Sequence, residues 1–234
     1  MGNEQSSTLA LDRAFLEGRR GLVYGPLSMA SDARIVMFVG PRGSGLTSLM
    51  LSVAGRMRAG SGRVTVLGHD AAAEAKDVRA LVGIVGVDMV DGLDAHDTVG
   101  RVLRRRWAWA HPFWSRRPKA DDAWVRGMLG GLFGPVRVPD AASRIMDLDE
   151  DQRFLLRIAL ALVDDPRALA IDSVDSLADP RARAAVMGRI AWLADRGCAV
   201  VMATHDPRDI GMMLDAGAAG VRAFSIIDGK EIER

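Results

Sequence analysis

One stretch near the start of the chain constrains the fold more than any other. Residues 34–50 read RIVMFVGPRGSGLTSLM. The apolar run predicts a buried strand, the glycines a tight loop, and Thr47 the start of a helix. Backbone N–H groups of such a loop point inward, and the helix dipole adds partial positive charge. We therefore predict a phosphate cradle. Its candidate binding residues are Gly40, Arg42, Gly43, Ser44, Gly45, Leu46, Thr47 and Ser48.

This stretch departs from the P-loop pattern G-x-x-x-x-G-K-[ST] at one position. Gly40, Gly45 and Thr47 match the pattern, but Leu46 stands where the lysine belongs. The lysine ammonium of a P-loop reaches the β- and γ-phosphates of a nucleotide. The sequence therefore predicts a nucleotide-binding fold that lacks its main phosphate contact.

Composition narrows the class of protein. A chain of 234 residues with 49% hydrophobic residues can bury one sizeable core, and a net charge of +1 gives no nucleic-acid footprint. The single cysteine, Cys198, excludes an internal disulfide and fits a reducing compartment. No apolar run approaches the ~18 residues that would span a bilayer. We predict one domain over residues 1–234, with a frayed segment at residues 1–12.

The order of elements resembles a known family. Short strands are predicted at Leu22–Tyr24 and Leu27–Met29, and an edge antiparallel hairpin at Gly60–Gly68. With the P-loop, these features resemble the nucleotide-binding subunit of ABC transporters, and later landmarks extend the resemblance over roughly residues 20–232. It implies an α/β fold: a P-loop NTPase core with a small antiparallel β subdomain and a helical subdomain at about residues 89–165.

The resemblance assigns roles to residues at two further strand ends. The strand before Asp172 resembles the Walker B strand, so Thr47 and Asp172 are the implied Mg²⁺ ligands. Ser173 stands at the position of the catalytic glutamate, and a hydroxyl cannot act as a carboxylate base near neutral pH. His205 follows an apolar strand and stands at the position of the family's switch histidine.

Two more family motifs are recognisable by their position in the chain but lack the residue types that the family uses there. Leu81–Asp88 resembles the strand that ends in the glutamine of the family's Q-loop, but no glutamine stands there. Leu148–Gln152 occupies the position of the L-S-G-G-Q signature, which in the family binds the γ-phosphate of a nucleotide held by the opposite subunit. Its central residues are acidic, which suits a capped helix start and not a phosphate. These residues are Asp149, Glu150 and Asp151.

The segment Arg104–Lys119 interleaves basic and aromatic residues, with three tryptophans in eight residues. One interpretation is a solvated helix that buries its tryptophans locally. The other is a docking face for a protein partner, such as a permease, or for an anionic membrane surface. The sequence favours neither interpretation over the other.

Three functional hypotheses follow. The first is an ABC-type ATP-binding subunit that associates with a membrane permease and lies in the cytoplasm, peripheral at the inner face of the cell membrane. In this hypothesis ATP and Mg²⁺ bind weakly, neither cofactor is required, and ATP hydrolysis is impaired or absent. The second is a working ATPase in which Arg42 replaces the lysine and Asp175 the glutamate. The third is a soluble regulatory or scaffold protein on the same fold. The resemblance leaves room for a homodimer or for a heterodimer with another nucleotide-binding subunit, and no nucleic-acid partner is expected.

Overall fold

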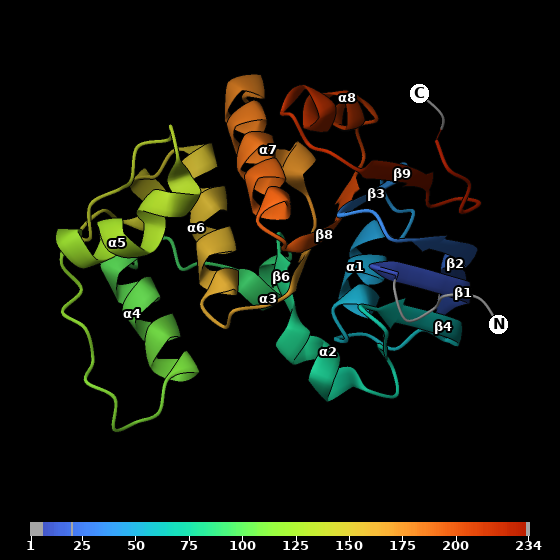
Figure 1. Cartoon of the computed structure of the whole chain (residues 1–234), viewed down its shortest axis with the longest axis horizontal. Helices are drawn as coiled ribbons and strands as arrows, with labels where there is room; N and C mark the ends of the chain where they lie inside the picture. The colour runs from blue at the N-terminus through green and yellow to red at the C-terminus, as the bar shows by residue number, and fades with distance from the viewer. Residues whose placement is uncertain (1–6, 20, 233–234) are drawn as a thin grey trace.

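The computed structural model describes residues 7–19 and 21–232, which form two β-sheets and a set of helices around them (Figure 1). One sheet is four-stranded, in the order β2-β1-β4-β5, and the other is five-stranded, in the order β6-β7-β8-β3-β9. In Figure 1 the four-stranded sheet lies at the right and helices α4 and α5 lie at the far left. The five-stranded sheet lies between them.

The five-stranded sheet is parallel. Its strands are β3 (Ile35–Val39), β6 (Val82–Val85), β7 (Ala168–Ile171), β8 (Ala199–Thr204) and β9 (Val221–Ser225). Every residue of β3, β7 and β8 is buried, as expected for a parallel sheet covered on both faces. Val39 pairs with Thr204, and Ile171 pairs with Met202. The residues that follow these strands therefore meet at one edge of the sheet.

The antiparallel sheet contains β1 (Leu9–Gly18), β2 (Gly21–Ser31), β4 (Ser61–Val66) and β5 (His69–Asp70). The predicted hairpin is confirmed, since β4 turns into β5 at the edge of the sheet. The two short strands predicted before the P-loop are parts of the single strand β2. Leu9–Leu11, expected to be frayed, pair with both β2 and β4, and Asp12 pairs with β4, because the period-2 pattern buries Leu9 and Leu11. Residues 1–6 of that expectation lie outside the described residues.

Helices cover both faces of the parallel sheet. The core helices are α1 (Leu46–Val53), α2 (Ala75–Leu81), α3 (Asp88–Asp91), α7 (Pro180–Asp195) and α8 (Arg208–Asp215), with a 3₁₀ turn at Val174–Ser176. Side chains of β3 alternate between two apolar clusters: Ile35 and Met37 pack in one, Val36 and Phe38 in the other. The second cluster also contains residues of α1 and the antiparallel sheet, so one central strand ties the two sheets together.

The remaining helices lie between β6 and β7 in the chain. They are α4 (Val99–Ala110), α5 (Asp122–Phe133), a 3₁₀ turn at Ile145–Asp147, and α6 (Glu150–Leu162). Their apolar faces share one cluster with the parallel sheet, where Leu103, Leu129 and Leu155 are fully buried. This packing fixes the start of α6, which carries the signature-like segment, relative to the sheet.

Candidate nucleotide-binding site

The predicted phosphate cradle lies between β3 and α1. Gly40–Gly45 form the loop, and α1 begins at Leu46. Gly45 has a φ of 86°, and a Cβ atom there would lie 2.2 Å from the carbonyl oxygen of Val23. Only glycine fits this position without strain. The Ser44 N–H donates to the Pro41 carbonyl at 3.1 Å and closes the turn. The predicted strand, loop and helix are thus confirmed.

The side chain at the lysine position is buried in the protein core and is not exposed to solvent in the loop. Leu46 is 2% exposed and belongs to the apolar cluster that contains Tyr24, Leu49 and Phe224. Its backbone N–H belongs to the first turn of α1, where the N–H groups have no partner within the helix. Arg42 is the cation of the loop, and its side chain is 82% exposed. The cradle therefore offers N–H groups without a fixed cation.

Thr47 and Asp172 lie together, as a shared Mg²⁺ role requires. The Thr47 hydroxyl donates to Asp172 Oδ2 at 2.6 Å. Asp172 is 1% exposed, and its Oδ1 atom has no hydrogen-bond partner among the described residues. Burial raises the pKa of Asp172, although the Thr47 hydrogen bond opposes this. A buried carboxylate oxygen beside a hydroxyl fits the oxygen ligands that Mg²⁺ prefers.

Ser173 follows Asp172 in a left-handed conformation, with a φ of 59°. Its carbonyl accepts a hydrogen bond from the Ser176 hydroxyl at 2.6 Å, so the residue serves the turn. No carboxylate stands at this position, as the sequence already indicated. The position contributes a bend in the chain.

The structure brings Asp175 and His205 together. Asp175 Oδ2 lies 3.1 Å from His205 Nδ1 and 3.9 Å from Arg42 Nη2. The Asp175 side chain is 7% exposed, and its Oδ1 atom has no partner among residues 7–19 and 21–232. The second functional hypothesis has Asp175 replace the glutamate. The 3₁₀ turn after Ser173 is the feature that carries it to His205.

The signature-like segment has the geometry of a capped helix start. The Asp149 N–H donates to Gln152 Oε1 at 3.0 Å, and the Gln152 N–H donates to Asp151 Oδ1 at 2.7 Å. Glu150 Oε2 accepts from the N–H groups of Ala178 and Asp179, at 2.8 and 3.3 Å. All three acids thus lie at the first turn of α6, and Glu150 ties that turn to the segment before α7.

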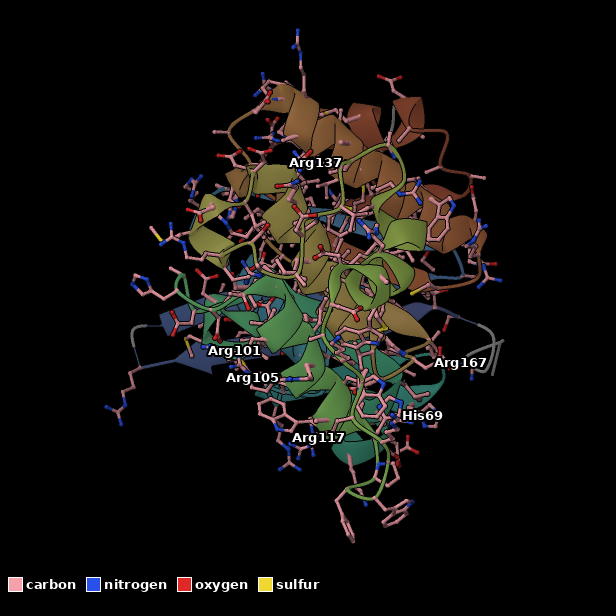
Figure 2. The ribbon with its side chains drawn as sticks, turned by 90° about the vertical axis from the view of Figure 1, so that its left-hand side faces the viewer. His69, Arg101, Arg105, Arg117, Arg137 and Arg167 are labelled. Atoms are coloured by element: carbon pink, nitrogen blue, oxygen red, sulfur yellow. The ribbon has the colours of Figure 1, made fainter. Side chains whose placement is uncertain are left out.

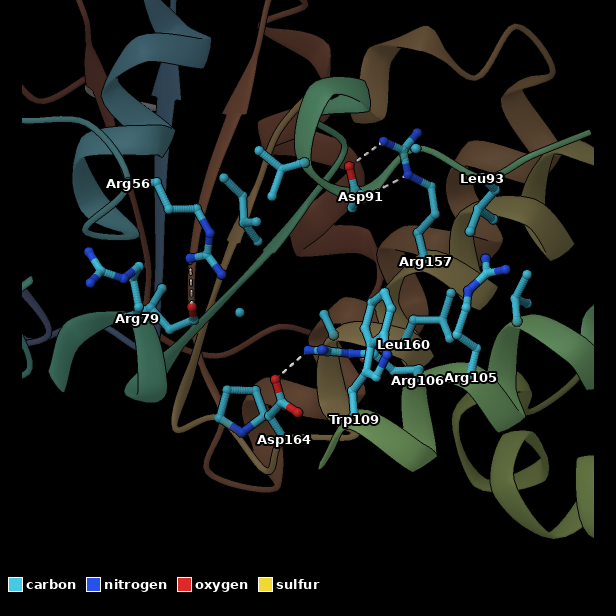
Figure 3. A pocket seen from close by; sticks show the side chains of 18 of the residues that line it. Arg56, Arg79, Asp91, Leu93, Arg105, Arg106, Trp109, Arg157, Leu160 and Asp164 are labelled. Carbon is cyan, nitrogen blue, oxygen red and sulfur yellow. Dashed lines mark hydrogen bonds and ion pairs between the residues drawn. The ribbon is translucent and has the colours of Figure 1, made fainter. Parts of the chain in front are cut away.

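Sequence reasoning missed a pocket of about 340 Å³ between the core and the helices α4 and α6 (Figure 3). Arg157 donates to both oxygens of Asp91, at 2.7 and 2.5 Å, beside the position of the missing glutamine. Arg56 and Arg79 line the opposite wall and bond only backbone carbonyls among the described residues. Burial, and then the charges of Arg79 and Arg106, lower the pKa of Arg56. The sequence feature that could have indicated this pocket is Arg157, which interrupts the apolar run of its helix.

The fold is that of ABC transporter ATPase domains. The structure of cbiO1 from Clostridium perfringens, part of the ABC transporter complex cbiONQ, matches with a TM-score of 0.71 and 18% identity, over 97% of this chain and 88% of that one. A nucleotide-free ATP-binding cassette from an ABC transporter also matches with a TM-score of 0.71, at 16% identity, over 97% of this chain and 90% of that one. The predicted fold class is confirmed.

Sequence relatives agree with the fold. The chain is 26% identical over 193 residues to a Nod factor export ATP-binding protein I from Rhizobium meliloti, which covers 82% of this chain and 55% of that protein. It is 27% identical over 208 residues to the daunorubicin resistance ATP-binding protein DrrA3 from Streptomyces coeruleorubidus, covering 88% of this chain and 58% of that protein. No protein-family model matches the chain.

The predicted resemblance is therefore confirmed: the relatives of this chain are ATP-binding proteins of ABC transporters. The matched region spans little more than half the length of these relatives. Within the described residues, no helix is both long and apolar enough to cross a membrane.

Proposed function

We propose that this chain acts as an ATP-binding subunit of the ABC transporter type that associates with a membrane permease, with ATP binding weakened and hydrolysis impaired or absent. The observation that carries the proposal is the burial of Leu46, which leaves the lysine position of a well-formed P-loop without a cation. Thr47 and Asp172 keep a place for Mg²⁺, so the site is weakened and not erased.

The expected loss of affinity follows from the missing contact. A hydrogen bond between a charged donor and a phosphate contributes about 1.5–3 kcal/mol, which is roughly 10- to 150-fold in affinity. Arg42 replaces this contact poorly, because its guanidinium is exposed and lies beside Asp175. Weak binding of Mg·ATP is the expected result.

Hydrolysis is impaired for a separate reason. Ser173 cannot accept a proton from the attacking water near neutral pH, since its unperturbed hydroxyl is far too weak a base. Its bond to Ser176 also commits the local backbone to a turn. Raising nucleotide affinity alone would therefore leave turnover slow.

Permease association is supported by the relatives and by the pocket. The matched proteins are named as export or resistance ATP-binding proteins or as parts of transporter complexes. The pocket presents Arg56 and Arg79 without ion pairs among the described residues, so an acidic side chain on a permease segment would complement it. Such a complex would hold the chain at the inner face of the cell membrane, in the cytoplasm.

Calorimetric titration of the purified chain with Mg·ATP tests the proposal. We expect no saturation at low-micromolar nucleotide, and low-micromolar affinity would contradict the assigned role of Leu46. A parallel measurement is co-purification with a permease encoded beside this chain. Failure of the Arg79→Glu variant to reduce that co-purification would remove the pocket from the proposal.

A working ATPase is a second candidate, favoured by the contact between Asp175 and His205. In that mechanism the carboxylate would hold the imidazole toward the attacking water, and the histidine would accept the proton. Steady-state turnover that falls at least about 100-fold in Asp175→Asn would support this candidate. Equal background turnover in wild type and variant would eliminate it.

A further inference from the structure

Two aromatic side chains project together from the loop between α4 and α5. Phe113 is 90% exposed and Trp114 is 75% exposed, and their rings meet edge to face with centroids 5.0 Å apart. We call this pair the aromatic tip. Figure 2 shows this loop, marked by Arg117, at the lower end of the molecule, far from Arg137 at the upper end. Large apolar side chains exposed side by side mark an interaction site.

The aromatic tip is held outward by the loop that carries it. The His111 ring stacks on Trp107 with centroids 4.0 Å apart, and His111 Nδ1 lies 2.8 Å from the Trp107 carbonyl oxygen. The Ser115 N–H donates to the Pro112 carbonyl at 2.9 Å, which closes a turn around the tip. The last turn of α4 therefore braces the tip, and Trp109 on the same helix is 73% exposed.

Four exposed cations lie in the same segment of the chain as the aromatic tip, and we call them the basic collar. They are Arg104, Arg116, Arg117 and Lys119. None forms an ion pair with any residue of the described chain, whereas nearby Arg105 pairs with Asp97 and Arg106 with Asp164.

The acids that follow the loop are occupied elsewhere. The carboxylates of Asp121 and Asp122 accept backbone N–H bonds from Trp124 and Ala141. The collar cations therefore have no ion-pair partner among the described residues of this loop and the helices beside it.

We propose that the aromatic tip and basic collar dock on the surface of an anionic lipid membrane. Aromatic rings favour the boundary between lipid headgroups and acyl chains, and cations nearby are attracted to anionic headgroups. A protein partner suits the tip less well, because a stable protein interface buries ~800 Å² per partner and needs a matching surface. A lipid surface adapts to a small convex tip. This inference does not rest on the proposed function, since lipids alone suffice to test it.

Sedimentation of the purified full chain with phosphatidylcholine vesicles, with and without phosphatidylserine, tests the proposal. We expect binding to the vesicles that contain phosphatidylserine, weakened by salt, with a blue shift of tryptophan emission. Arg116→Glu with Arg117→Glu should reduce binding by about fivefold or more per cation. Phe113→Ser with Trp114→Ser should reduce it by about tenfold or more.

Matched controls separate the tip from general surface effects. Arg137→Glu reverses an arginine whose side chain is 82% exposed and which lies at the opposite end of the molecule (Figure 2). Leu22→Ser with Ile227→Ser removes apolar side chains that are 63% and 64% exposed elsewhere. Both controls should bind vesicles as the unmodified chain does.

Three outcomes would overturn the proposal. They are absence of vesicle binding by the unmodified chain, equal binding by tip and control variants, and capture by a solubilised permease that depends on the tip while vesicles do not bind. Circular dichroism should show the same fold in every variant. If the aromatic variant unfolds, the collar variant alone decides the matter.

Discussion

The P-loop and the signature-like segment depart from the family's phosphate-binding patterns in different ways. At the P-loop, Leu46 replaces a cation and is buried in the core. At the start of α6, acids replace small residues and bond backbone N–H groups, as Glu150 does with Ala178. In both segments the replacing residue contacts its own chain. Restoring nucleotide chemistry should therefore cost stability, more at the buried segment than at the exposed one.

The largest expected effect is that of Leu46→Lys. Mg·ATP affinity should rise roughly 10- to 150-fold, because the lysine restores a charge-assisted phosphate contact. The free energy of unfolding should fall by about 2 kcal/mol, because the core loses a buried leucine. Calorimetry and urea denaturation measure the two effects.

Leu46→Met is the matched control, since it keeps the apolar volume and adds no charge. It should leave both affinity and stability close to those of the unmodified chain. Turnover at the rates of intact relatives in Leu46→Lys would refute the role assigned to Ser173.

The next effect tests the acidic segment. A carboxylate about 5 Å from a γ-phosphate costs on the order of 3 kcal/mol per unit charge at an effective dielectric near 20. We therefore predict that ATP does not drive dimerisation of the unmodified chain. Asp149→Ser, Glu150→Gly and Asp151→Gly, combined with Leu46→Lys and Ser173→Gln, should permit it.

Sedimentation velocity with and without Mg·ATP measures this dimerisation. The control variant carries Leu46→Lys and Ser173→Gln and keeps the three acids. ATP-dependent dimers of the unmodified chain would show that the acidic segment does not face a nucleotide.

A third effect concerns the buried carboxyl group of Asp172 beside the P-loop and the pH dependence of the free energy of unfolding. Because burial raises the pKa of Asp172 in the folded state, the folded state binds its proton more tightly than the unfolded state does. Asp172 therefore lowers stability as pH rises above its unfolded pKa of about 3.9, up to its folded pKa. Asp172→Asn should raise the free energy of unfolding at pH 7 but have little effect at pH 3.5, if Mg²⁺ is removed.

Urea denaturation at the two pH values gives the comparison. Adding Mg²⁺ should stabilise the unmodified chain and not the variant. An equal effect of the substitution at both pH values would show that lost packing, and not the buried charge, sets the difference.

The smallest expected effect is that of Glu150→Ala. It removes the acceptor for the Ala178 and Asp179 N–H groups, and should cost about 1 kcal/mol because the bonds are exposed to water. Glu150→Gln keeps an acceptor and should recover most of the loss. Thermal unfolding measures both. A loss as large as that of Leu46→Lys would remove the difference between the two segments.

Much of the fold could be predicted from local sequence. The apolar run before Gly40 and the glycines of the loop predicted the strand and the turn that leads into α1, and the acid was expected directly after a buried strand, since each depends on neighbours in the chain. Strand boundaries were less secure. The separate strands at Leu22–Tyr24 and Leu27–Met29 are one strand, because both sides of Gly25-Pro26 pair with β1 despite a register shift between them.

The sequence by itself determined which groups the site lacks: no lysine at Leu46, no glutamate at Ser173, and acids in place of small signature residues. Only the tertiary structure decided what the remaining groups contact. The Leu46 side chain shares an apolar cluster with Tyr24, the Asp175 carboxylate contacts His205, and Glu150 accepts a hydrogen bond from the Ala178 N–H. These partners lie some twenty to thirty positions apart in the chain. Local propensity and periodicity carry no information about such contacts, because they depend on how sheets and helices pack.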